Sequence, residues 1–265
     1  MDRNESIMET TGVLYCHQGF TDIVNCLAMI NYYSGKYKNL IVLMRKDAEN
    51  MINFYVRKLG NITMLYADKN VLDSANDSGI VRYLETKGLS NYACQFIGFT
   101  DRERNDIYQN NFSKSDTTGN FVKEFYQCYK IPYETRIEMF SIVRDAEAEE
   151  RKYTEIVGDS KQYICKHVGP RLGYPYQVIK VDTPSNVKSI DLYNSSDVFF
   201  DMIKVLENSS EIHVIDSVWA AICYHLDAKY GLLKNVPVSL YCHNGHNKMF
   251  VEPIALPNWT IHYFR

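Results

Sequence analysis

Two polar residues, Asp216 and Ser217, end the apolar strand Ile212–Ile215 at a point in the sequence where an anion could bind. The apolar run stops at Asp216-Ser217, and a helical apolar pattern then continues to Leu226. A buried parallel strand that runs directly into a helix has this pattern. We expect the side-chain oxygens of Asp216 and Ser217 to cap the first free N–H groups of that helix. A helix that begins at the carboxyl end of a parallel strand is an anion site, so the segment predicts a phosphate-bearing ligand.

A second polar cluster, His17–Asp22, follows the first predicted strand. Gly19 permits a tight turn and a close approach of a ligand. His17 and Asp22 lie near the carboxyl end of the strand, where either can act as general base on a hydroxyl nucleophile. In the other interpretation, Thr21 or Asp22 only caps the following helix, and for Asp22 both interpretations stay open. The segment contains no GxGxxG pattern, so a dinucleotide is not indicated.

The second half of the chain repeats this arrangement in the segment Tyr163–Arg171. Again a strand ends in a His and is followed by a loop with a Gly and a basic residue. Lys166, His167 and Arg171 can meet a diphosphate, Arg as a bidentate donor and Lys as a point charge. The alternative for Lys166 is a strand residue that faces solvent.

Two further loops are predicted to border the same edge of the sheet. Asn194 and Ser195 precede a helix, and an ordinary N-cap is expected directly after them. In the loop after the central strand, Ser217 can donate a hydrogen bond to a phosphate. Asp216 would repel a phosphate, so we expect it to bind backbone N–H groups or a ribose hydroxyl.

Motifs for other chemistries are weak or missing. His243 and His246 have a spacing that could bind a metal, but no matched Cys or carboxylate cluster surrounds them, and a cleft-lining or solvated loop is favoured. No DxD motif ends a strand, which gives no case for a Mn²⁺-dependent sugar-nucleotide site. The sequence also lacks GxxxxGK[ST] and GxSxG, which argues against a P-loop NTPase and an α/β-hydrolase.

Strands and helices alternate in both halves of the sequence, which predicts an α/β fold with parallel sheets. The predicted strands are Gly12–Cys16, Leu40–Met44, Ile62–Tyr66, Tyr92–Ile97, Gln162–His167, Gln177–Val181, Glu211–Ile215, Val238–Cys242 and Trp259–Tyr263. The predicted helices are Ile23–Tyr33, Asp47–Leu59, Ile80–Thr86, Asn120–Tyr129, Tyr133–Tyr153, Val198–Glu207 and Ser217–Tyr230. The charged run Arg144–Lys152 is interpreted as a solvated helix face.

A break in the pattern at Gly158-Asp159-Ser160 divides the chain into two predicted domains, 1–157 and 158–265. We expect two Rossmann-like parallel-sheet domains that face each other across a cleft, with ligands at the carboxyl ends of both sheets.

Composition sets broad limits. With 265 residues, 46% of them hydrophobic, the chain can build one large or two small α/β domains. Its net charge of −3 gives no electrostatic case for nucleic acid as a partner. Seven cysteines without a CxxC pair, and a polar first segment without a signal peptide, predict reduced thiols and a cytoplasmic location. No uncharged apolar run approaches the roughly 20 residues of a transmembrane helix.

The segments YCHQGFTDIVNCLAMINYY, YICKHVGPR, EIHVIDSVWAAICYHL and PNWTIHYF together resemble small GT-B glycosyltransferases of bacteria, phages and large DNA viruses. The resemblance implies a glycan or glycoconjugate acceptor on domain 1–157 and a nucleotide-diphosphate sugar donor on domain 158–265. It also implies catalysis without a bound metal or other cofactor, with basic side chains and helix N-termini stabilising the leaving diphosphate. For a viral chain the location would be the host cytoplasm.

The resemblance also implies roles for individual residues. Those implied for the donor are Lys166, His167, Arg171, Asn194, Ser195, Asp216 and Ser217. Those implied for the acceptor side are His17, Gly19 and Asp22, with His17 or Asp22 as the base. No second Arg follows His167 in the HxRR arrangement of fucosyltransferase-like members, so GDP-fucose is not favoured as donor.

Glycosyl transfer is also coherent from the residues alone, because it needs a base for the acceptor hydroxyl and charge stabilisation for the leaving phosphate. Two alternatives stay open at this point. One is a non-catalytic glycan- or nucleotide-binding module of the same fold. The other is a different phosphate-using α/β enzyme, such as a phosphatase or an epimerase.

Overall fold

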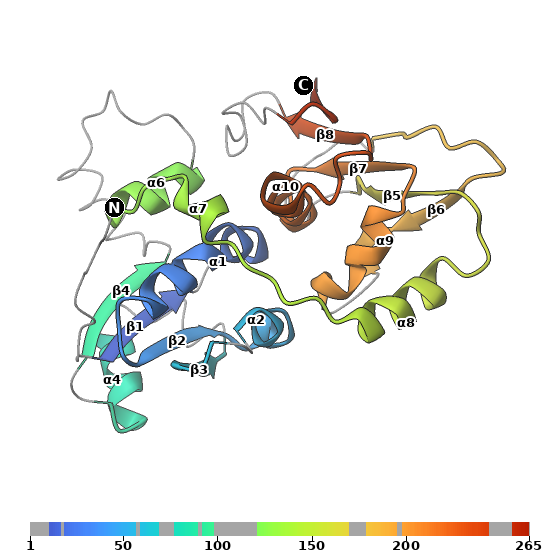
Figure 1. Ribbon diagram of the computed structural model, residues 1–265. Helices are drawn as coiled ribbons and strands as arrows, with labels where there is room; N and C mark the ends of the chain where they lie inside the picture. Colours follow the sequence, from blue (N-terminus) through green and yellow to red (C-terminus); the bar gives the residue numbers. More distant parts are fainter. Residues whose placement is uncertain are drawn as a thin grey trace. The chain divides into compact units, whose positions relative to one another are not determined.

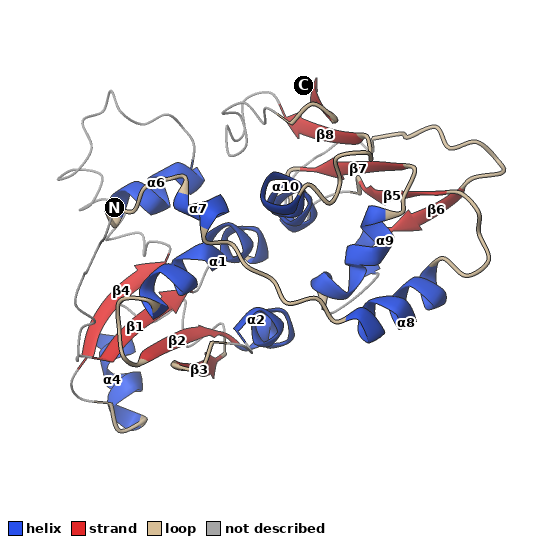
Figure 2. Ribbon diagram, viewed as in Figure 1, coloured by secondary structure: helices blue, strands red, loops and turns tan. Residues whose placement is uncertain are grey.

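The computed structural model describes residues 11–16, 19–56, 59–68, 77–89, 92–97, 121–169, 179–194, 198–243 and 256–264. These residues form two compact α/β units, the first running to Val143 and the second starting at Arg144 (Figures 1 and 2). Each unit has its own parallel sheet, as the alternation of elements predicted. In the part of the chain given above, no helix is both long and apolar enough to cross a membrane.

The first sheet has the strand order β3-β2-β1-β4, and all of its neighbouring strands are parallel. Its strands are β1 (Thr11–Cys16), β2 (Leu40–Arg45), β3 (Ile62–Ala67) and β4 (Tyr92–Ile97). They confirm the four strands predicted for this half of the chain, with ends that differ by one residue at most. Strands β1 and β2 are buried along nearly their whole length, as expected of a parallel sheet covered on both faces.

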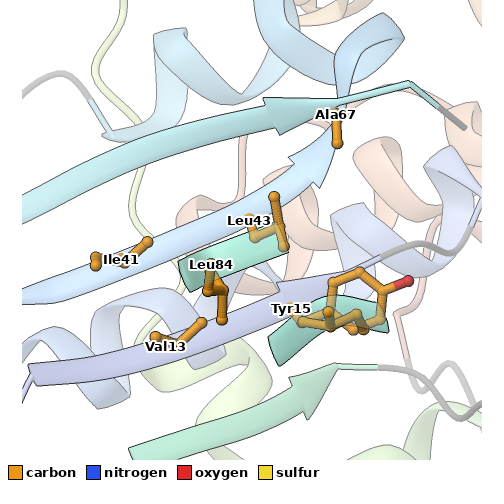
Figure 3. Packing of buried hydrophobic residues seen from close by; sticks show 7 residues of the cluster. Val13, Tyr15, Ile41, Leu43, Ala67 and Leu84 are labelled. Atoms are coloured by element: carbon orange, nitrogen blue, oxygen red, sulfur yellow. The ribbon is translucent and has the colours of Figure 1, made fainter. Parts of the chain in front are cut away.

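Helices pack on both faces of this first sheet. The helical elements of the unit are α1 (Phe20–Ser34), the 3₁₀ turn η1 (Lys46–Ala48), α2 (Glu49–Val56), α4 (Asp77–Thr86), α6 (Phe121–Cys128) and α7 (Thr135–Glu138). On one face, alternate residues of the strands pack against α4 in a buried cluster that Figure 3 shows. The cluster consists of Val13, Tyr15, Ile41, Leu43, Ala67, Ile80 and Leu84.

The second sheet has the order β6-β5-β7-β8-β9 and is again parallel throughout. Its strands are β5 (Tyr163–His167), β6 (Lys188–Asp191), β7 (Glu211–Ile215), β8 (Val238–His243) and β9 (Trp259–Phe264). The central position predicted for β7 is confirmed. The strand predicted at Gln177–Val181 is wrong over its described residues, since 179–181 are irregular and the edge strand is β6. Only one residue of β6 is buried, so this strand carries little apolar signal.

The described helices of the second unit pack on one face of its sheet. They are α8 (Ala146–Ile156), α9 (Ile203–Glu207) and α10 (Val218–Tyr230), and the predicted helix Val198–Glu207 begins as a 3₁₀ turn, η3 (Phe199–Met202). The Tyr163 hydroxyl donates to the Val205 carbonyl of α9 at 2.8 Å, and the Trp259 indole donates to Asp227 of α10 at 2.9 Å. Tyr163 and Trp259 lie on the same face of the sheet by strand register, so α9 and α10 cover that face.

The helix predicted over Tyr133–Tyr153 is wrong, because the structure has two helices, α7 and α8, with residues 139–145 irregular between them. The Asp145 side chain accepts a hydrogen bond from the Ala148 N–H at 3.0 Å and so caps a new helix, α8. Helix α8 packs against α9 and belongs to the second unit. The two units divide at Val143/Arg144, so the expected boundary at 157/158 lies within the second unit, directly after α8.

The charged run that starts at Arg144 is not simply a solvated face. Arg144 Nε donates to Glu149 Oε1 at 2.9 Å, and its Nη1 and Nη2 donate to the two carboxylate oxygens of Glu207 at 2.6 and 2.7 Å. Glu149 is only 1% exposed. A buried carboxylate requires a partner, so Arg144 ties the start of the second unit to both α8 and α9.

We predict that Arg144→Ala lowers the free energy of unfolding by about 2–4 kcal/mol, because it leaves the buried Glu149 carboxylate without its main partner. The measurement is urea unfolding followed by circular dichroism. The matched control is Lys152→Ala on α8. The ion pair of Lys152 with Glu155 is at the surface, and its loss should cost under about 1 kcal/mol. Equal effects of the two substitutions would show that the Arg144 cluster does not stabilise the second unit.

Candidate functional site

The second sheet has a topological switch point between β5 and β7. From β5 the chain goes to β6 on one side, and the next strand, β7, lies on the other side. Parallel strands bring all their carboxyl ends to one edge, and ligands of open α/β sheets bind outside that edge at such a switch point. The residues after β5, β6 and β7 are therefore the candidate site of this unit.

At the end of β7, Ser217 is the N-cap of α10 but does not act as a capping side chain. Its backbone is extended, with φ −158° and ψ 179°, and its side chain makes no hydrogen bond to the helix. Ser217 is 7% exposed, and its hydroxyl has no hydrogen-bond partner among the described residues. The expectation that Ser217 caps α10 through its side chain is therefore wrong. A buried hydroxyl beside the free N–H groups of a 13-residue helix is suited to an anionic oxygen.

Asp216 lies between the last residue of β7 and Ser217, and it is half-buried. Burial raises the pKa of the neighbouring Cys242 thiol to about 12, and the negative charge of Asp216 adds to this shift. Cys242 is thus a protonated, inert thiol at neutral pH. The carboxylate of Asp216 lies close enough to the end of β8 to act on it.

At the end of β5, Lys166 and His167 point to opposite faces of the sheet, because successive strand residues alternate. His167 lies on the face that the helices cover. Its ring stacks on Tyr193 with centroids 5.8 Å apart and planes 9° apart, and its Nδ1 atom has no hydrogen-bond partner among the described residues. Burial lowers the pKa of His167, and the nearby Asp191 carboxylate opposes this only in part. His167 is therefore neutral at pH 7.

Lys166 lies on the other face and lines a pocket of about 510 Å³ beside the ends of β5 and β6. The sequence left open whether Lys166 faces solvent, and the structure shows it half-buried. Its Nζ contacts Thr183 Oγ1 at 3.5 Å, and within the described ranges it forms no ion pair. Asp182 and Asp191 line the same pocket, so its charge is mixed.

The structure does not describe some of the predicted site residues, and for others it describes only the backbone. His17, Arg171, Ser195 and His246 lie outside the described residues, as do the side chains of Asn194 and His243. Asn194 ends the 3₁₀ turn η2 (Leu192–Asn194), which follows β6 at the same edge. Over the residues with described positions, no group of three His, Cys, Asp or Glu side chains is arranged to hold a metal ion.

In the first unit, Gly19 is the N-cap of α1, which begins earlier than predicted. Its carbonyl accepts the first helical hydrogen bond, from the Ile23 N–H, at 3.0 Å. Asp22 lies in the first turn of α1 and is not the N-cap, which removes the interpretation of Asp22 as an ordinary N-cap. A Cβ atom on Gly19 would lie 3.8 Å from Asp22 Oδ2, so the carboxylate is next to the exposed start of the helix. A role of Asp22 as a base stays a prediction.

Sequence reasoning missed three residues at these two edges. Tyr193 directly precedes Asn194, but nothing in its neighbourhood predicted the stacking on His167. Arg45 ends the apolar strand β2 and Lys46 follows it. Their cations lie over the rings of Phe20 at 5.2 Å and Tyr66 at 5.6 Å, and they pair with Asp47 and Glu49. A basic pair at the end of a buried strand was the signal that could have identified them.

Comparison with known proteins places this arrangement among glycosyltransferase folds. No protein-family model matches the chain, and no curated protein sequence matches it. Among solved structures, the glycosyl transferase family 9 protein from Veillonella parvula DSM 2008 superposes with a TM-score of 0.57 at 11% identity, over 97% of this chain and 89% of that one. The iron-containing dodecameric glycosyltransferase TibC from enterotoxigenic E. coli H10407 gives 0.46 at 12% identity, over 89% and 59% of the two chains. The spinosyn forosaminyltransferase SpnP gives 0.36 at 12% identity, over 91% and 81%. The first similarity shows that this chain shares a fold of two Rossmann-like α/β units with a bacterial glycosyltransferase.

Proposed function

We propose that the protein is a glycosyltransferase that moves a sugar from a nucleotide-diphosphate donor to a hydroxyl group of a glycan or glycoconjugate. The observation that carries the proposal is the β7–α10 junction. There the buried Ser217 hydroxyl, without a partner among the described residues, lies at the N-terminus of α10 at the switch point of its sheet. The shared fold with a glycosyltransferase supports the reaction class.

In this proposal the second unit binds the donor. The Ser217 hydroxyl and the first N–H groups of α10 donate to oxygens of the diphosphate, and His167 donates from Nδ1. When the bond between the anomeric carbon and the phosphate oxygen breaks, its electron pair moves to the diphosphate. Donors that are already in position stabilise this developing charge without reorganisation.

The acceptor is assigned to the first unit, with His17 or Asp22 as the general base. The base removes the proton of the acceptor hydroxyl as its oxygen forms a bond to the anomeric carbon. A carboxylate such as that of Asp22 can accept this proton directly. A base of this kind is suited to transfer with inversion at the anomeric carbon.

The pKa of His167 gives a pH prediction. Burial holds this pKa below its ordinary value, and a bound diphosphate favours the protonated form and raises it. Binding therefore takes up a proton, so affinity must rise as the pH falls. Between about pH 8 and pH 6, we therefore expect the affinity of the wild type for pyrophosphate to rise relative to that of His167→Gln, which cannot take up this proton. Titration calorimetry at several pH values measures it, and parallel pH profiles of the two proteins would exclude His167 from the site.

The catalytic prediction concerns Ser217→Ala. With UDP-, GDP- and dTDP-sugars as donors and simple glycosides or water as acceptors, we expect release of one nucleoside diphosphate, with kcat/KM about 10- to 100-fold lower in the variant. The thermal stability of the variant should be unchanged, because the hydroxyl has no partner among the described residues to lose. Ser185→Ala, an exposed serine at the other end of β6, is the matched control. Binding of a donor without any turnover would favour the non-catalytic binding module.

We also predict that EDTA leaves the transfer rate unchanged. In the proposal, the α10 N-terminus, Ser217 and His167 stabilise the charge of the leaving diphosphate, which is the role that a divalent cation has in other sugar transferases. The transfer rate is measured in about 5 mM EDTA and in added Mg²⁺ or Mn²⁺, and the two rates are compared. A rate that is lost in EDTA and restored by Mn²⁺ would contradict metal-free catalysis.

A further inference from the structure

Tyr193 has an exposed ring in a fixed position at the candidate donor edge. It lies in η2, directly after β6, and is 60% exposed, more than any other large hydrophobic side chain in the described part of the chain. One face of its ring packs on the imidazole of His167 at 5.8 Å and 9°. An exposed aromatic ring normally has rotamer freedom, so this packing selects one orientation.

The backbone of Tyr193 is held as well. Its N–H donates to Asp191 Oδ1 at 2.9 Å, which closes a short turn at the end of β6. The preceding residue, Leu192, is only 1% exposed and anchors the turn in the core. Tyr193 thus presents a flat, preorganised apolar surface, and little conformational entropy is lost when a ligand covers it.

The position of Tyr193 relative to the α10 N-terminus also fits a nucleotide. Strands β6, β5 and β7 are consecutive neighbours in the sheet. Adjacent strands are about 4.8 Å apart, so the ends of β6 and β7 are separated by about 10 Å. This separation is within the reach of a nucleoside diphosphate that has its phosphates at Ser217 and its base at Tyr193.

We propose that Tyr193 is the stacking surface for the nucleobase of the donor, with His167 behind its ring. This inference rests on the proposed function, since it assigns a second part of the same ligand. Every nucleobase has a π face, so an aromatic ring contributes affinity without choosing the base. Tyr193 therefore increases affinity for nucleotides as a class, and the hydrogen-bonding edges of the base are read by other groups.

The test compares nucleoside diphosphates with inorganic pyrophosphate in titration calorimetry on the full chain. For whichever of UDP, GDP and dTDP binds, we expect Tyr193→Ala to lose about 5- to 100-fold in affinity, the range for loss of one base-stacking ring. Affinity for pyrophosphate should change less than twofold, roughly, because no base is present. Tyr193→Phe should keep wild-type affinity, and Tyr263→Ala, which removes another exposed ring in the same unit, should have no effect.

The outcomes separate the two proposals. If wild type binds neither pyrophosphate nor any nucleoside diphosphate, the proposed donor site is wrong. If it binds a nucleoside diphosphate and Tyr193→Ala binds it equally well, the stacking role is overturned while the donor site stands. An equal loss for pyrophosphate in Tyr193→Ala would also overturn it, because Tyr193 would then act only by positioning His167.

Discussion

The burial of strand β7 is the constraint on which the candidate site depends. It lies at the centre of its sheet, and Ile212 and Val214 are completely buried on the face that the helices cover. Because α10 follows β7 almost at once, its first turn must start at the carboxyl edge of the sheet. Helix α10 is fixed from its other end as well, where Asp227 accepts hydrogen bonds from Asn258 and from the Trp259 indole, each at 2.9 Å. The backbone of Ser217 is therefore held at this edge of the sheet, between β7 and α10.

The two faces of the second sheet differ in chemistry. The helix-covered face carries mainly apolar and aromatic residues, whereas the opposite face combines polar residues with the buried Ile164 and Ile215. There His213 lies between Glu211 and Tyr241, with its ring nitrogens 3.0 Å from the Glu211 carboxylate and 3.1 Å from the Tyr241 hydroxyl. These contacts satisfy both nitrogens of a nearly buried imidazole, so His213 is explained by the sheet itself. Lys166 lies on this face as well, and His167 lies on the helix-covered face. The two side chains therefore share only the carboxyl edge of the sheet.

Elements with strong local patterns could be predicted from the sequence, and elements defined by tertiary contacts could not. Strand β7 and helix α10 were predictable because an apolar run, two polar residues and a helical repeat follow one another directly. The edge strand β6 was missed because it buries one residue, and the break before α8 was missed because Asp145 and Arg144 act through partners that a local pattern does not contain.

The same distinction applies within the candidate site. Parallel topology alone places His167 and Ser217 at one edge, so their types and their positions at strand ends were sufficient to select them. The sequence predicted two roles for the Ser217 hydroxyl, helix cap and phosphate donor, because an N-cap and an anion site use the same residue types; only the capping role is wrong. Tyr193 could not be selected at all, since its orientation depends on the ring of a residue on the neighbouring strand. One residue from each of β5, the turn after β6 and the turn after β7 thus contributes a different property: a neutral imidazole, a fixed aromatic surface and a hydroxyl at a helix N-terminus. An anion alone needs only the first and the third of these, so the presence of the second favours a ligand that joins a phosphate to a flat ring.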